Sequence, residues 1–274
     1  MIVGLLMLGG GVATGVFGSL LGLGGGVLIV PLLTLGFGLP LRDAVGVSLV
    51  CVIMTSSAAA GVYLERHVAN LRLGMTLELF TALGALVGGS IAFLLDERLI
   101  SLAFAGLLMY VAVTMARAGR VPPAAGSDLD VAPEPVAQES LTMLDRLSGD
   151  GYRVRNLGRG VVGATGAGVA SALLGIGGGI VKVPLMHLSM GVPLRVATAT
   201  SNLMIGVTAA ASTVIYVANG GVDPYVAGPT AIGVFIGASA GSRLSHRVNL
   251  HLLRLLFVVV LGYTAIQMLL RAIQ

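Results

Sequence analysis

The chain has 274 residues, of which 56% are hydrophobic and 10% are charged, with a mean hydropathy of +0.98 and a formal net charge of +4. A soluble domain carries about 25% charged residues, so this composition excludes a soluble globular protein and indicates a membrane protein. The basic residues lie between apolar runs, which is typical of membrane orientation and does not indicate a nucleic-acid partner. The single cysteine, Cys51, excludes an internal disulfide.

The first half of the chain contains four long apolar runs and one short run. A helix needs about 20 apolar residues to cross a bilayer, and full spans are therefore predicted over 2–21, 44–64, 73–95 and 99–116. The short run, 27–38, follows the glycine run 22–26. At 1.5 Å per residue it covers about 18 Å, which is well short of the roughly 30 Å hydrocarbon core.

Residues 117–159 differ in character, because they contain four prolines, many charged residues and few large apolar residues. This composition predicts a solvated cytoplasmic linker with a short amphipathic helix at 139–148. The linker divides the chain into a first membrane repeat, 1–116, and a second, 160–274. The second repeat is predicted to contain spans at 160–174, 196–217, 225–242 and 252–270, with a short run at 180–190.

The two halves share one motif at a constant offset of 153 positions, as from Leu21 to Leu174. Leu21–Leu32 and Leu174–Leu185 each contain a glycine run followed by an apolar run and a proline, and such an internal repeat indicates duplicated architecture. Glycine costs roughly 1 kcal/mol per helical position relative to alanine, and hydrocarbon cannot satisfy an opened backbone. Two matching interruptions therefore indicate the binding site of a transporter.

Two topologies are compatible with these segments. If each short run crosses the membrane, each half has five crossings and the halves are inverted; if each re-enters, each half has four and they are parallel. Cytoplasmic loops carry an excess of basic residues, and this rule favours the inverted arrangement. With a cytoplasmic linker, that arrangement places inside Arg66, Arg72, the six linker arginines, Arg195, Arg243, Arg247 and Arg254.

The expected fold is therefore an all-α polytopic membrane protein made of two inverted-topology repeats. Each repeat has about five helical segments, which are four full spans and one short segment that is broken by glycine. We expect it in the cell (inner) membrane, with the linker cytoplasmic and both termini outside. A homodimer is one assembly that this class of protein could form.

The glycine runs are the predicted site of anion binding. A helix that begins at a glycine run presents unpaired N–H groups and a positive dipole end. Hydroxyl and amide side chains near each short helix add donors that suit an oxyanion without a fixed charge. The predicted substrate-binding residues are Gly24, Gly25, Gly26, Ser48, Thr55, Gly177, Gly178, Gly179, Lys182, Thr200, Ser201 and Asn202, and Pro31 and Pro184 are predicted kinks.

Lys182 replaces Ile29 of the first half, so one charge breaks the symmetry of the repeat. A charge within the membrane indicates function, although a lysine that snorkels to the interface is the alternative. Glu78 and His187 are candidates for carrying a coupling proton, with helix packing as the alternative role for each.

Other chemistries have no matching motif. Gly24–Gly26 lacks the ending of a Walker loop and the preceding strand of a dinucleotide site, and the histidines show no metal-binding spacing. We therefore predict no catalytic residue, no metal and no cofactor, and hence no enzyme.

The string Gly175–Pro184, followed by Gly191-Val192-Pro193 and Ala197–Met204, resembles the TauE/SafE family of membrane permeases. The first half carries a weaker copy, Gly22–Pro31 and Gly46–Ser48, and the resemblance covers nearly the whole chain outside the linker. It implies transport of sulfite or organosulfonates. The expected function is that of a secondary transporter that moves a small sulfur-containing anion by alternating access. The alternatives are an anion channel and a membrane sulfur-relay component.

Overall fold

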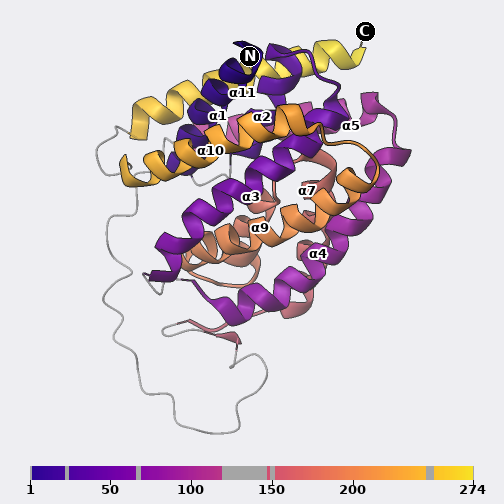
Figure 1. Cartoon of the computed structure of the whole chain (residues 1–274). Coiled ribbons are helices and arrows are strands. Elements are labelled where there is room, and N and C mark those ends of the chain that lie inside the picture. Colours follow the sequence, from indigo (N-terminus) through magenta and orange to yellow (C-terminus); the bar gives the residue numbers. More distant parts are fainter. Residues whose placement is uncertain are drawn as a thin grey trace, which may run out of the picture.

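The computed structural model describes residues 2–21, 25–65, 69–118, 147–148, 152–244 and 250–273. The regular elements within these ranges are helices. In the first half they are α1 (Ile2–Leu21), α2 (Gly26–Pro31), η1 (Leu32–Gly36), α3 (Leu41–Glu65), α4 (Leu71–Leu94) and α5 (Glu97–Ala118). In the second half they are α7 (Leu157–Leu174), α8 (Gly179–Pro184), η2 (Leu185–Ser189), α9 (Leu194–Ala218), α10 (Pro224–Leu244) and α11 (Leu250–Ile273). They form one bundle, and both chain ends lie at its upper end in Figure 1.

The outer surface of the bundle is apolar. Six of the described helices, α1, α3, α4, α5, α7 and α9, are long and apolar enough to cross a membrane. Large apolar side chains such as Leu5, Leu94 and Leu188 are at least 72% exposed, which is the arrangement that lipid requires. The protein is therefore a multi-pass membrane protein, and the predicted helical fold class is confirmed. Helices α10 and α11 have 21 and 24 residues. The apolar stretch within α11, Val258–Leu270, is shorter than the roughly 20 residues that a full membrane span needs.

The two halves interlock rather than forming separate bundles. Helix α1 packs on α10 and α4 packs on α7, while α3 packs on α9 and α5 on α11. In the sequence repeat α1 corresponds to α7 and α4 to α10, so the α1–α10 pair is equivalent to the α7–α4 pair. Because α3 corresponds to α9 and α5 to α11, each of the other two pairs is equivalent to itself. Each short helix packs against two long helices of its own half, α2 against α1 and α3 and α8 against α7 and α9, and α2 also contacts α11.

Glycines allow the closest of these contacts. Gly84 and Gly88 of α4 lie against the backbone of Thr165 and Val169 of α7. The equivalent glycines of α10, Gly237 and Gly241, lie in the same way against Val12 and Val16 of α1. Small residues at such spacing let helix backbones approach each other in a membrane, where packing rather than a hydrophobic driving force holds helices together.

Helices α3 and α9 cross with their chains running in opposite directions. Gly46 near the start of α3 lies beside Tyr216 near the end of α9, whereas Ser56, ten residues further along α3, lies beside Gly206, ten residues earlier in α9. These two helices are equivalent in the sequence repeat. Their antiparallel packing is what two inverted repeats require, and the inverted arrangement in the membrane remains a prediction.

Each short helix changes from α to π geometry directly after its proline. Helix α2 ends at Pro31 and is continued by η1, and α8 ends at Pro184 and is continued by η2. Proline has no N–H and cannot donate the regular α-helical hydrogen bond, which explains the wider turn that follows. The continuous segment Gly26–Gly36 spans about 16 Å at 1.5 Å per residue, so it reaches only part of the way across a bilayer.

The end of the predicted linker is packed, not solvated. Leu147 and Val154 are buried beside Met190 at the end of η2. The Asn70 side chain donates hydrogen bonds to the Leu147 carbonyl (2.8 Å) and to the Tyr152 hydroxyl (2.7 Å). The density of prolines and charges in this region conceals these few apolar contacts in the sequence. Apart from residues 147–148, the predicted helix at 139–148 lies outside the described residues.

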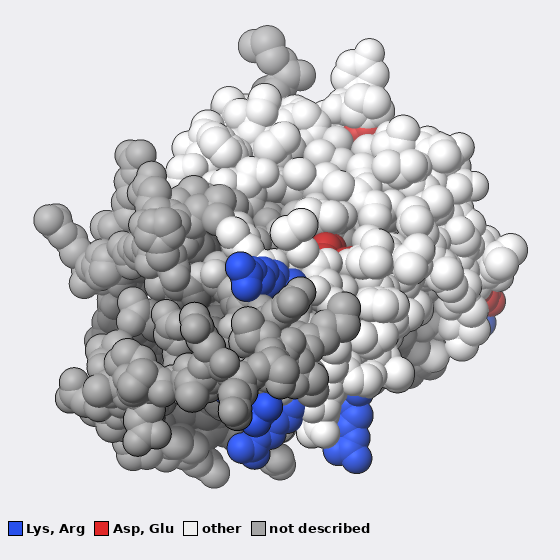
Figure 2. Space-filling view, turned by 90° about the horizontal axis from the view of Figure 1, so that it is seen from below, with Lys and Arg blue, Asp and Glu red and all other residues white. Residues whose placement is uncertain are grey.

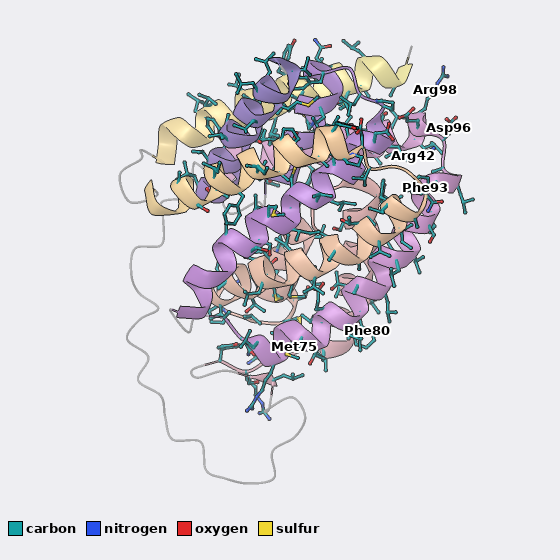
Figure 3. All side chains as sticks on the ribbon, in the orientation of Figure 1. Arg42, Met75, Phe80, Phe93, Asp96 and Arg98 are labelled. Carbon is teal, nitrogen blue, oxygen red and sulfur yellow. The ribbon has the colours of Figure 1, made fainter. Side chains whose placement is uncertain are left out.

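Basic side chains gather on the lower face of the molecule, as Figure 2 shows from below. The exposed arginines at and before the first turns of α4 and α7 are Arg72, Arg153, Arg155 and Arg159. Arg42, Asp96 and Arg98 lie together at the opposite end from Met75 of α4 (Figure 3). The lower face is therefore the one that we predict to be cytoplasmic.

Candidate anion site at the second glycine run

The second glycine run turns the chain from the end of α7 into α8 within four residues. Gly175 caps α7 and its N–H donates to the Ser171 carbonyl (2.9 Å). Gly175, Gly177 and Gly178 all have positive φ, between 67° and 77°. Other residues pay about 1–2 kcal/mol in this conformation, so the sequence of glycines makes the tight entry into α8 possible.

The two glycine runs lie in contact. Gly26 at the start of α2 packs against the Gly175 carbonyl and Ile176. The Ser48 hydroxyl donates to the Gly175 carbonyl at 2.7 Å and lies 3.3 Å from the Gly26 carbonyl. Gly25 caps α2 with a φ of 75°. The predicted site residue Gly24 lies outside the described residues.

Two buried hydroxyls flank the start of α8 without a hydrogen-bond partner. Ser171 of α7 and Ser201 of α9 are both 0% exposed, and neither hydroxyl oxygen makes a hydrogen bond in the described chain. A Cβ at Gly178 would lie 3.3 Å from the Ser171 Cβ, and a Cβ at Gly179 would lie 3.7 Å from the Ser201 Oγ. Buried polar groups are nearly always paired, so two unpaired hydroxyls beside one helix start indicate a place for a polar guest.

Lys182, the only lysine of the sequence, lies one turn further along α8 in a buried ion pair. Its ammonium donates to Glu78 Oε2 (3.1 Å) and to the Thr208 hydroxyl (2.5 Å), and the Thr208 hydroxyl lies 2.6 Å from Glu78 Oε1. Lys182 is 1% exposed and Glu78 is 7% exposed. This burial excludes a lysine that snorkels to the membrane surface.

The Lys182 stem runs back toward the glycine run. A Cβ at Gly178 would lie 3.4 Å from the Lys182 Cε, and side chains of a helix point toward its N-terminus. The Lys182 stem and Ser171 thus both border Gly178, while the ammonium itself contacts Glu78 and Thr208. We refer to Ser171, Gly178, Gly179, Lys182 and Ser201 as the α8 cradle.

The equivalent place in the first half carries no charge. The positions that correspond to Lys182, Glu78 and Ser171 are Ile29, Ala231 and Gly18. Ile29 and Ala231 are buried in the main hydrophobic core. The same helix arrangement is therefore built twice, once with an ion pair and free hydroxyls and once with apolar residues.

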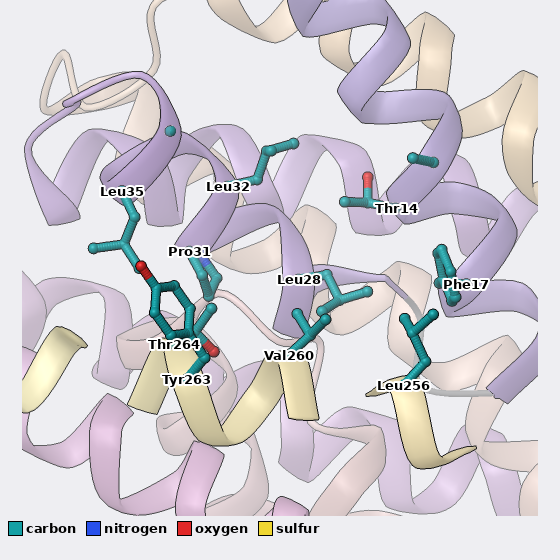
Figure 4. A pocket seen from close by; sticks show the side chains of 12 residues that line it. Thr14, Phe17, Leu28, Pro31, Leu32, Leu35, Leu256, Val260, Tyr263 and Thr264 are labelled. Carbon is teal, nitrogen blue, oxygen red and sulfur yellow. The ribbon is translucent and has the colours of Figure 1, made fainter. Parts of the chain in front are cut away.

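The apolar character of the first half extends to the groove between α1, α2 and α11 (Figure 4). It has a volume of about 350 Å³ and is lined by residues such as Phe17, Leu28 and Val260. The Thr14 and Thr264 hydroxyls in it donate to carbonyls of their own helices, and the Tyr263 hydroxyl accepts a hydrogen bond from the Gln267 side chain (3.2 Å). None of the residues that line this groove is charged.

The remaining predicted residues have other contacts. The Thr55 hydroxyl donates to the Val52 carbonyl (2.9 Å), and Thr200 accepts a hydrogen bond from the Asn70 N–H (2.9 Å). The Asn202 carbonyl accepts from Ser56 (2.6 Å), and the Asn202 side chain is buried at the α3–α9 crossing. His187 is exposed on η2, with Nδ1 2.9 Å from the Val192 carbonyl.

Two residues that the structure places around Lys182 and the start of α8 are absent from the residues predicted to bind the substrate. They are Ser171 and Thr208. Ser171 carries the same signal in the sequence as Lys182, because a polar residue replaces an equivalent Gly18. Thr208 has no such signal, since its equivalent is also a threonine, Thr55.

The α8 cradle can bind an anion through several hydrogen-bond donors. It offers two hydroxyls, the N–H groups of Gly179 and Ile180 at the start of α8, and one ammonium group; the next two amides, of Val181 and Lys182, donate to the Gly178 carbonyl. Hydrogen bonds between such donors and a charged acceptor are shorter and stronger than neutral ones.

Comparison with known proteins gives one family. The family model described as sulfite exporter TauE/SafE matches residues 7–268. A probable membrane transporter protein of Xylella fastidiosa is 29% identical over 98% of this chain and 95% of its own length. The probable membrane transporter protein YunE of Bacillus subtilis is 24% identical over 92% of both chains. No solved structure gives a significant match.

Proposed function

Because the chain belongs to the TauE/SafE sulfite exporter family of membrane transporters, we propose that it is a secondary transporter of a small sulfur-containing anion. Sulfite and organosulfonates are the proposed substrates, and alternating access across the cell membrane is the proposed mechanism. The α8 cradle is the proposed binding site.

The observation that carries this proposal is the pair of buried, unpartnered hydroxyls of Ser171 and Ser201 beside the start of α8, the short helix that carries Lys182. A sulfite or sulfonate group presents three oxygens that only accept hydrogen bonds. Two hydroxyls and the N–H groups of Gly179 and Ile180 match these acceptors, and Lys182 supplies the opposite charge. Because most of the donors are neutral, the anion would bind weakly enough to be released on the other side of the membrane, as transport requires.

The interlocked packing supports alternating access. Helices α4, α7 and α9 pack on one another, with α8 against α7 and α9, whereas α1, α3 and α10 pack on one another, with α2 against α1 and α3. The two groups meet at the α3–α9 crossing, close to the contact between Gly26 and Gly175. A rocking motion of one group against the other would open the cradle to either face of the membrane, as in other transporters with internal repeats.

Uptake by proteoliposomes tests this function. Purified protein would be assayed with radiolabelled sulfite, methanesulfonate, sulfoacetate, thiosulfate, sulfate and taurine. We expect saturable uptake of sulfite or a sulfonate. Ser171→Ala and Ser201→Ala should each raise KM by about 10–100-fold, and the double variant by more, because a hydrogen bond to a charged group contributes about 1.5–3 kcal/mol.

The matched control is Ser57→Ala, an exposed serine whose hydroxyl donates to the carbonyl of its own helix (2.8 Å). Its KM should equal that of the wild type. Non-saturable flux without exchange would indicate an anion channel instead. An unchanged KM in the double variant would remove both hydroxyls from the site.

A further inference from the structure

We propose that the transported anion replaces Glu78 as the counter-ion of Lys182 when it binds. Glu78 takes up a proton in the same step, so that transport of the anion is coupled to transport of protons. This inference rests on the proposed function, and it names the coupling ion and its carrier.

The hydrogen bonds of Thr208 allow this exchange. The Thr208 hydroxyl lies 2.6 Å from Glu78 Oε1 and 3.1 Å from the Met204 carbonyl, and it accepts a hydrogen bond from Lys182. It has one proton to donate and two lone pairs. When Glu78 is ionised, the Thr208 proton points to the carboxylate. When Glu78 is protonated, the Thr208 proton turns to the Met204 carbonyl, and Thr208 accepts the new Glu78 proton.

Charge balance in the buried site requires the proton. In the structure the Glu78–Lys182 pair is neutral and almost completely buried. A monovalent anion that binds Lys182 would leave two negative charges beside one positive charge in a low-dielectric site, which is strongly unfavourable. One proton on Glu78 restores neutrality, because the carboxylate becomes a carboxylic acid and the anion becomes the sole counter-ion of the ammonium.

The two partners of Lys182 have separate approaches. The anion side is formed by Ser171, Gly178 and Ser201 at the start of α8. Glu78 instead borders a crevice of about 150 Å³ between α4 and α9, which is lined by Asn70, Gly74, Met75, Thr200 and Val207 among others. Met75 at its edge is 75% exposed and lies toward the lower end of the molecule (Figure 3). A proton can therefore reach Glu78 without passing through the anion site.

The other charged or titratable groups near this site make different contacts. On α4, α7, α9, η2 and the segment before α7 they are Arg72, Tyr152, Arg153, Arg155, Arg159, His187, Arg195 and Tyr216. Tyr216 donates to the Ala172 carbonyl (3.0 Å), Tyr152 accepts from Asn70, and His187 contacts the Val192 carbonyl. Lys182 is the charged group bonded to Glu78, so Glu78, not His187, is assigned as the proton carrier.

The fold does not require the ion pair. The equivalent residues of the first half, Ile29 on α2 and Ala231 on α10, are both buried and carry no charge. The pair is therefore retained in one half for a reason other than the packing of a short helix against its neighbours.

Simultaneous measurement of anion and proton uptake tests the coupling. Proteoliposomes with an internal pH-sensitive dye would take up labelled methanesulfonate, which keeps one negative charge throughout the assay range. We expect about one proton per anion for the wild type and faster uptake when the outside is more acidic. Glu78→Gln, which mimics the protonated carboxyl, should retain exchange of labelled for unlabelled anion within about threefold and lose proton movement.

The control is His187→Gln, which should retain the proton-to-anion ratio of the wild type. Wild-type uptake of the anion without protons, or proton movement that persists in Glu78→Gln, would overturn the coupling and leave the transport function intact. If the wild type takes up neither methanesulfonate nor sulfite, the proposed function itself fails. The wild-type ratio decides the question even if Glu78→Gln does not fold.

Discussion

Removing the Glu78–Lys182 pair one residue at a time, and then completely, separates the effect of the charges from the effect of packing. Glu78→Ala leaves a buried ammonium, and Lys182→Ile leaves a buried carboxylate. Each single change should cost about 3–5 kcal/mol, because an isolated buried charge has lost its counter-ion. The double variant reproduces Ala231 and Ile29 of the first half and should be close to neutral, since well-packed apolar residues often replace a buried ion pair without loss.

The chain contains its own probe for this measurement. It has no tryptophan, but its single cysteine, Cys51, is 0% exposed on α3. A fluorogenic thiol dye therefore reports the unfolding of purified protein in detergent as Cys51 becomes accessible. At roughly 2–4 °C per kcal/mol for a chain of this size, each single variant should melt about 6–20 °C lower. The double variant should melt within a few degrees of the wild type.

The decisive quantity is the coupling energy between the two substitutions. If the losses of the single variants add in the double variant, the two charges do not stabilise each other and the pairing argument is refuted. The double variant should also lose anion uptake completely while remaining folded. Uptake by that variant would show that the cation is not part of the binding site.

Two further predictions use matched residues. Ser201→Ala breaks no hydrogen bond and should leave the melting temperature unchanged or slightly raised. Ser48→Ala at the equivalent position removes the 2.7 Å bond to Gly175 and should cost about 1–3 kcal/mol in the thiol-dye assay. Equal losses in the two variants would contradict the assignment of a free hydroxyl to Ser201. Gly178→Ala and Gly38→Ala both place a side chain at positive φ and should each cost about 1–2 kcal/mol. A Cβ at Gly178 meets the Ala167 carbonyl at 3.1 Å, whereas a Cβ at Gly38 meets nothing, so only Gly178→Ala should abolish uptake.

Most of the helices could be predicted from the sequence to within three residues at each end. The span expected over 44–64 is α3, Leu41–Glu65, and the span expected over 196–217 is α9, Leu194–Ala218. Long apolar runs that end at charged, proline or glycine residues define such helices locally. The boundary between α5 and α7 was less predictable, because Leu147 and Val154 are isolated apolar residues whose packing partners lie on α4, η2 and the following loop.

The site was predictable only in part. The glycine run and Lys182 break the local pattern and can be recognised in the sequence, as can the positions where the repeat becomes asymmetric. The pairing of Glu78 with Lys182 cannot, since these residues are 104 positions apart and meet only because α4 packs into the other half of the molecule. The roles of Ser48 and Ser201 were equally hidden. Both follow the same motif, and only the packed structure shows that one hydroxyl is bonded and the other is free.

The asymmetry of the two halves can itself be tested by moving the charges. Starting from the inactive double variant, Ala231→Glu with Ile29→Lys would place the pair beside α2, where Thr55 corresponds to Thr208. We expect no recovery of uptake, because Gly18 provides no hydroxyl where Ser171 does and because the Ser48 proton is already bonded to Gly175. If uptake returned in proteoliposomes, the ion pair alone would be sufficient and the free hydroxyls would be irrelevant. The variant must first be shown to melt as a folded protein. If uptake then does not return, the second half binds the anion because it combines a cation with unpaired donors, and the first half does not offer that combination.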